Sequence, residues 1–109
     1  FTITDAYFMK QTYQMYFGRN TKDGVYVTDA AWESFRELLS MSFDGYTIQD
    51  VEGSWKGSTE DTKLVTVTTK HKEKVNDLIN AYTEMYNQDA VGLLITNPMQ
   101  FVTKQSEVY

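Results

Sequence analysis

The densest group of potentially reactive side chains lies in the middle of the sequence. Its members are four carboxylates, one tryptophan and one lysine, namely Asp50, Glu52, Trp55, Glu60, Asp61 and Lys63. Two neighbouring carboxylates can act as acid and base when one of them is desolvated, and they can also bind a cation beside the π face of a tryptophan. The alternative is a solvated hairpin loop whose tryptophan is anchored in the core. The residue types alone favour the solvated loop, while the acid–base or cation-binding site stays open as the other interpretation.

Three other polar residues each have a functional and a structural interpretation. Arg19 follows Phe17-Gly18 at a predicted strand end, where its guanidinium could hold a carboxylate with two hydrogen bonds or form an ordinary surface ion pair. Gln88 either ends a helix or contacts a ligand at the rim of a site. The chain has one histidine, His71, and no cysteine, so we expect no metal, no cofactor and no thiol nucleophile.

Length and charge limit the classes of function. The chain has 109 residues, which fits one domain. We expect that domain at residues 11–102, after an N-terminal extension or leader at 1–10 and before a C-terminal tail at 103–109. With 10 basic and 15 acidic residues the net charge is −5, which argues against nucleic acid and anionic membranes as partners. Small cationic or zwitterionic molecules stay open as ligands.

The elements that must position these side chains follow from hydrophobic periodicity. We predict strands at Gln11–Arg19, Tyr46–Trp55, Lys63–Thr69 and Ala90–Thr96, and helices capped by Thr28 and by Thr68 or Thr69. Acidic residues near Gly53 indicate a bulge or a site there, and Lys56–Asp61 is predicted as a loop. The last strand is nearly all apolar, so we expect it in the centre of the sheet. Residues 101–109 are predicted as a short edge strand or a tail.

The resulting order is β-α-β-β-α-β, which is typical of an α+β, ferredoxin-like fold. Such a fold has an antiparallel sheet with two helices on one face. The other face is left open, and this chain is rich in aromatic residues, 15% of the total. We therefore expect a homo-oligomer whose sites lie between subunits.

Four segments carry a resemblance to a known family. They are YFGRN in the first strand, FDGYTIQDVEGSW, TEDTKLVTV, and YNQDAVGLL after the second helix. Over about Tyr13 to Val102 the sequence resembles the small phage enzymes that destroy S-adenosylmethionine, formerly named hydrolases and now understood as lyases. It is also similar to a family of short uncharacterised bacterial proteins with an FGR, a Gly-x-Trp and a Gln-Glu-Ser-Val at comparable places.

The resemblance implies a reaction without cofactor or metal. The substrate's own carboxylate attacks its γ-carbon, giving 5′-methylthioadenosine and homoserine lactone. A glutamate before the third strand matters for activity in the family, and Glu60 matches it best, with Asp61 as the fallback. The remaining candidates for substrate binding are Trp55, Asp61, Tyr46, Glu52, Arg19 and Gln88. The resemblance also implies a homo-oligomer, with a trimer favoured, in the cytoplasm of an infected bacterium. The alternative is a non-catalytic ferredoxin-like domain that binds a small ligand or a partner.

Overall fold

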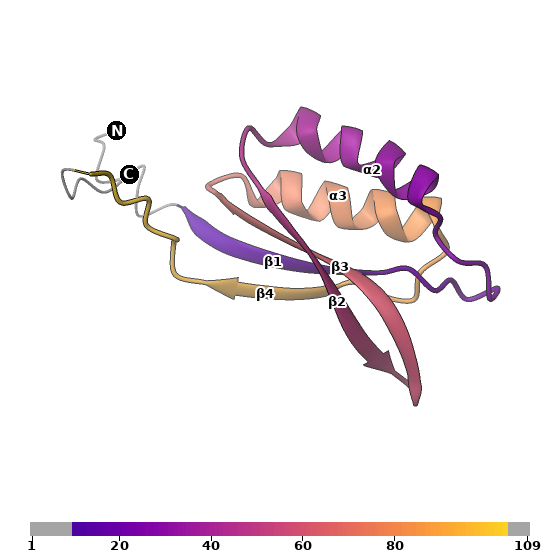
Figure 1. Cartoon of the computed structure of the whole chain (residues 1–109). Coiled ribbons are helices and arrows are strands. Elements are labelled where there is room, and N and C mark those ends of the chain that lie inside the picture. Colours follow the sequence, from indigo (N-terminus) through magenta and orange to yellow (C-terminus); the bar gives the residue numbers. More distant parts are fainter. Residues whose placement is uncertain (1–9, 105–109) are drawn as a thin grey trace.

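The protein folds into a four-stranded antiparallel sheet covered on one face by two helices (Figure 1). The computed structural model describes residues 10–104, without the side chain of Trp55. The elements are β1 (Gln11–Gly18), α2 (Asp29–Ser42), β2 (Thr47–Trp55), β3 (Ser58–Thr69), α3 (Lys72–Met85) and β4 (Gly92–Thr96). The strand order is β2-β3-β1-β4. The predicted α+β, ferredoxin-like arrangement is therefore confirmed.

The core lies between the helices and one face of the sheet. Alternate residues of β1, namely Tyr13, Met15 and Phe17, are buried against the helices, as period-2 alternation requires. Helix α2 buries Trp32, Phe35 and Leu39, and α3 buries Val75, Leu78 and Tyr82. The Phe17 ring packs 5.1 Å from Phe35 and 4.7 Å from Tyr82 between centroids, which is the range of favourable aromatic pairs.

Only one of the two predicted helix caps is correct. Thr28 precedes α2, and its Oγ1 accepts a hydrogen bond from the Ala31 N–H at 3.1 Å. Helix α3 instead has His71 at its N-cap, without a side-chain cap. Thr69 still belongs to β3, and its Oγ1 accepts the His71 N–H at 3.0 Å. Strand β3 ends at Thr69, as predicted, but the helix begins only at Lys72, so the cap position falls on His71.

The predicted loop at Lys56–Asp61 is wrong, because β2 and β3 form a tight hairpin. Only Lys56 and Gly57 connect the strands, with φ of 51° and 80°. Positive φ at both central residues is the signature of the two-residue turn that matches strand twist. The ladder runs without interruption from Thr47↔Thr66 to Trp55↔Ser58, so the predicted bulge near Gly53 is absent. The hairpin end extends beyond the helices (Figure 1).

The prediction that the last strand is central is also wrong. Strand β4 is the sheet edge next to β1, and Leu93, Leu94 and Ile95 are 38%, 46% and 39% exposed. A uniformly apolar strand usually indicates burial on both faces, but the path of the chain decides where it pairs. Residues 101–104 form no strand, and 105–109 lie outside the described residues. Among residues 10–104, no helix is long and apolar enough to cross a bilayer.

Candidate functional site

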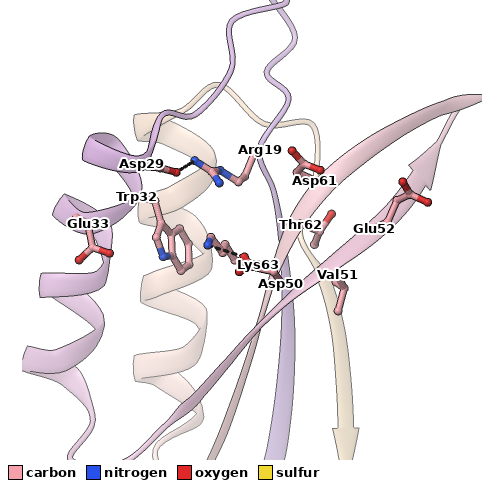
Figure 2. A pocket seen from close by; sticks show the side chains of 10 residues that line it. All are labelled: Arg19, Asp29, Trp32, Glu33, Asp50, Val51, Glu52, Asp61, Thr62 and Lys63. Carbon is pink, nitrogen blue, oxygen red and sulfur yellow. Dashed lines mark hydrogen bonds and ion pairs between the residues drawn. The ribbon is translucent and has the colours of Figure 1, made fainter.

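Two hollows flank the β2–β3 hairpin, one on each side of the sheet. The helix-side cleft has a volume of about 720 Å³ and lies between the start of α2 and the strands β2 and β3 (Figure 2). The open-face groove has a volume of about 1050 Å³, slightly above the usual range of small-molecule sites. Its walls come from the end of β1 with the turn that follows, the β2–β3 hairpin, and the α3–β4 connection.

Arg19 lies in the helix-side cleft as part of the protein's own framework. Its side chain is 8% exposed. The Arg19 Nε donates to the carbonyl of Val27 at 2.8 Å, and a terminal nitrogen donates to Asp29 Oδ1 at 2.8 Å. The guanidinium also lies 4.5 Å from the centre of the Tyr26 ring. The predicted carboxylate partner of Arg19 is thus a residue of this chain.

The second cation of this cleft is paired as well. Lys63 Nζ lies 2.5 Å from Asp50 Oδ1 and 5.8 Å from the centre of the Trp32 ring. Asp61 accepts a hydrogen bond from the Tyr26 hydroxyl at 2.9 Å. Figure 2 shows the Arg19–Asp29 and Lys63–Asp50 ion pairs, with Trp32 beside Lys63. Both cations of the cleft already have carboxylate partners within the chain. The cleft is therefore lined by structural ion pairs.

Glu60 lies on the opposite side of the sheet, in the open-face groove. Adjacent residues of a strand point to opposite faces, so Glu60 and Asp61 are separated by the sheet. Glu60 pairs in register with Gly53, and its Oε2 accepts the backbone N–H of Asn20 at 3.1 Å. Among residues 10–104, no lysine or arginine forms an ion pair with this carboxylate. The hydrogen-bond partner of its Oε2 is a backbone N–H.

Asn20 joins two of the predicted site residues. Its N–H donates to Glu60, and its carbonyl accepts a hydrogen bond from Gln88 Nε2 at 2.7 Å. At the groove's rim, Asp89 lies 3.2 Å from Lys22 and 3.9 Å from Lys56. The groove is also bordered by Glu52, but this residue pairs in register with Asp61, so its side chain points to the helix side. Both lysines of the groove, Lys22 and Lys56, share Asp89, and neither forms an ion pair with Glu60.

The predicted site residues do not all lie together. The open-face groove brings together Glu60 and Gln88. Arg19, Asp61 and Glu52 line the helix-side cleft; Glu52 pairs in register with Asp61 and also borders the groove. Tyr46 precedes β2 and donates or accepts a 2.5 Å hydrogen bond with Ser40. It is seven residues along the strand from Gly53, about 23 Å. The side chain of Trp55 lies outside the described part of the structure.

The sequence pattern assigned no functional role to Asn20. This residue begins the segment Asn20–Gly24, which forms a turn with Gly24 at φ 77°. Its first residue nevertheless provides both backbone contacts that connect Glu60 to Gln88. Backbone hydrogen bonds do not depend on residue type, so no sequence signal could have identified this role.

The groups near the site whose pKa values are shifted belong to the structural framework of the protein. The pKa of Asp29 is lowered, chiefly by the hydrogen bond from Arg19. Burial raises the pKa of the Tyr82 hydroxyl well above its ordinary value, so this group stays protonated. The Tyr82 hydroxyl donates to the carbonyl of Gly18 at 2.6 Å. The hydrogen bond with Ser40 lowers the pKa of Tyr46, away from the groove.

Comparisons with known proteins place this fold. No curated protein matches the sequence. A solved structure described as a phage SAM lyase in complex with S-methyl-5′-thioadenosine has a similar fold, with a TM-score of 0.56 and 14% sequence identity. The alignment covers 91% of this chain and 84% of that chain. Residues 12–101 match the model of a family described as "Protein of unknown function (DUF3574)". Because that match spans most of the chain, the protein belongs to the DUF3574 family.

Proposed function

We propose that this protein cleaves S-adenosylmethionine within the open-face groove. The substrate carboxylate attacks the γ-carbon, the bond from that carbon to sulfur breaks, and the sulfonium becomes a neutral thioether. The products are 5′-methylthioadenosine and homoserine lactone, without water or a proton from the protein. The supporting likeness is the shared fold with a phage SAM lyase.

The observation that carries the proposal is the position of Glu60. Its carboxylate is held by the Asn20 N–H at 3.1 Å and, within residues 10–104, has no basic side chain as partner. A substrate ammonium would complete this pair with a charge-assisted hydrogen bond. Glu60 would then fix the methionyl arm while the reacting atoms stay free of protein contacts.

The chemistry asks for orientation more than for reactive side chains. The substrate provides both the nucleophile and the leaving group, so bringing them into an attack geometry is the main contribution that a protein can make. A carboxylate placed on the sulfonium would oppose the reaction, because that positive charge disappears in the transition state. We therefore assign Glu60 to the ammonium end and leave the sulfur without a charged partner.

The sheet edge supports the expectation of a homo-oligomer. Residues 90–103 contain no charged side chain, and β4 within them is exposed along its whole length. The other edge strand, β2, carries Asp50 and Glu52, which is a common protection against edge pairing. Residues 90–92 line the groove and lead into β4, so a second copy seated on β4 would stand at the groove's wall. We therefore place the site between subunits. The resemblance to phage enzymes further suggests that the protein acts in the cytoplasm of an infected bacterium.

A product assay tests the reaction. Purified protein and S-adenosylmethionine, without added metal, should yield methylthioadenosine together with homoserine lactone. Glu60→Gln should abolish most of the turnover, while Glu84→Gln, an exposed glutamate on α3, should leave it unchanged. Homoserine appearing from the start would mean that water attacks instead. Thermal stabilisation by S-adenosylmethionine without turnover would favour the non-catalytic binding domain, and equal turnover in Glu60→Gln would remove Glu60 from the mechanism.

Light scattering after size exclusion tests the oligomer. We expect the wild type to elute as an oligomer. The resemblance implies a trimer, and light scattering would identify it by its mass. Leu94→Lys places a charge on β4 and should dissociate it, whereas Leu38→Lys, on α2 with 36% exposure, should not. A monomeric wild type, or an oligomer unaffected by Leu94→Lys, would contradict this arrangement.

A further inference from the structure

The strand position directly beneath the Glu60 carboxylate is a glycine. A Cβ added to Gly18 would lie 2.7 Å from Glu60 Cδ and from Glu60 Oε2, a separation that carbon and carboxylate atoms do not share. Glu60 therefore rests on the bare backbone of β1. From there its Oε2 also reaches the Asn20 N–H, two residues further along the chain.

Backbone conformation does not explain this glycine. Among the described residues, the glycines with positive φ are Gly24 and Gly57, so an alanine at position 18 would fit the local backbone. Gly18 also pairs in the regular β1–β3 ladder, opposite Thr62. What the glycine provides is space on the open face, and the group that fills this space is the Glu60 carboxylate.

The backbone at this position is fixed from the helix side. The carbonyl of Gly18 accepts the Tyr82 hydroxyl at 2.6 Å, and Tyr82 is fully buried. Arg19, which follows Gly18, donates its backbone N–H to the carbonyl of Asp61 at 2.9 Å, and its own carbonyl accepts the Val27 N–H at 2.7 Å. A side chain at position 18 could not push the strand away, so the flexible Glu60 side chain would have to move.

We propose that Gly18 is a positioning residue whose missing side chain forms the seat of the Glu60 carboxylate. The seat fixes Glu60 through two features of one strand end, the open space above Gly18 and the N–H of Asn20. Gln88 supports the second feature through its hydrogen bond to the Asn20 carbonyl. The catalytic consequence of the seat rests on the proposed function; its structural part does not.

The structural part is tested by the Asn20 amide resonance in a ¹H–¹⁵N NMR spectrum. An amide that donates to a carboxylate resonates downfield, so Glu60→Ala should shift the Asn20 amide upfield. Gly18→Ala should shift it in the same direction and by a similar amount, with the rest of the spectrum retained. Gly45→Ala is the matched control, because a Cβ there meets no atom within 4 Å. An Asn20 amide that stays at its wild-type position in Gly18→Ala would overturn the proposal.

The catalytic part is tested by a double-mutant cycle. A displaced orienting group can lower a rate by about 100-fold, so Gly18→Ala should lower kcat by about tenfold to 100-fold, with a smaller change in KM. In a Glu60→Ala background the same substitution should cost nothing further, because its target is gone. An equal additional loss in that background would overturn the seat as the cause.

The two experiments separate the seat from the reaction. A wild-type protein without turnover, combined with the expected Asn20 shifts, would refute the proposed function and support the seat. Turnover that depends on Glu60, combined with an unmoved Asn20 amide in Gly18→Ala, would support the function and refute the seat.

Discussion

Arg19→Leu distinguishes a structural guanidinium from one that binds substrate. In the folded chain Arg19 donates to the Val27 carbonyl and to Asp29, and it lies over the Tyr26 ring at 4.5 Å. Although burial disfavours the charged form, the hydrogen bond and the charge of Asp29 raise the pKa of Arg19. The side chain stays charged at every pH at which the protein is folded, so its loss removes all three contacts together.

The size of the effect follows from these contacts. Val27 is 3% exposed, so its carbonyl would lose its Arg19 partner away from water, which costs about 1–3 kcal/mol. The cation–π contact adds about 0.5–1 kcal/mol. The ion pair adds little, because the Asp29 side chain is 94% exposed and water screens it. The total is about 2–4 kcal/mol out of the roughly 5–15 kcal/mol that stabilise a domain.

Urea unfolding followed by circular dichroism measures this difference. Arg36→Leu is the matched control, because Arg36 is an exposed residue of α2 whose partners are Glu33, at 3.4 Å, and the hydroxyl of Tyr46. It should change stability by less than about 0.5 kcal/mol. Equal midpoints for the two variants would refute the structural reasoning. Unchanged stability together with weaker substrate binding in Arg19→Leu would instead restore the role that the sequence suggested.

Three further predictions concern the framework around the groove. Tyr82→Phe removes the hydrogen bond to a buried strand carbonyl and should lower the free energy of unfolding by about 1–3 kcal/mol, measured in urea. Gly57→Ala places a side chain at φ 80° in the hairpin turn and should cost about 1–2 kcal/mol, visible as a lower Tm. Since the hydrogen bond from Arg19 lowers the pKa of Asp29, its stabilisation is complete above about pH 4 and is lost as the pH falls through the lower folded value. The stabilities of wild type and Asp29→Asn should therefore differ slightly at pH 7 and converge as the pH falls below the folded pKa, and a constant difference would contradict the pairing.

The candidate site shows how far residue types alone can be interpreted. Glu60 and Gln88 were both predicted and both line the open-face groove, whereas Glu52 pairs in register with Asp61 and points to the helix side. Asp61 was predicted as the alternative to Glu60, yet the two residues lie on opposite faces of β3 because they are neighbours in a strand. A loop at this place would not have fixed the two carboxylates on opposite faces, so the assignment depended on the hairpin turn.

The sequence by itself determined the kind and the order of the elements. Alternation at Tyr13, Met15 and Phe17 indicates a strand, and the spacing of Trp32, Phe35 and Leu39 indicates a helix. Both patterns were confirmed, because burial of one face imposes a period that is written locally in the chain. The ferredoxin-like order followed from these elements.

Only the tertiary structure decided which residues share a face and which strand forms the edge. The two-residue turn at Lys56-Gly57 sets the register of β2 and β3, and a shift of one residue would exchange the faces of Glu60 and Asp61. The edge position of β4 and the pairing of Arg19 with Val27 and Asp29 likewise join segments that the sequence pattern does not connect. Periodicity records burial along one element, whereas register and pairing depend on contacts between distant elements, and these exist only once the chain has folded.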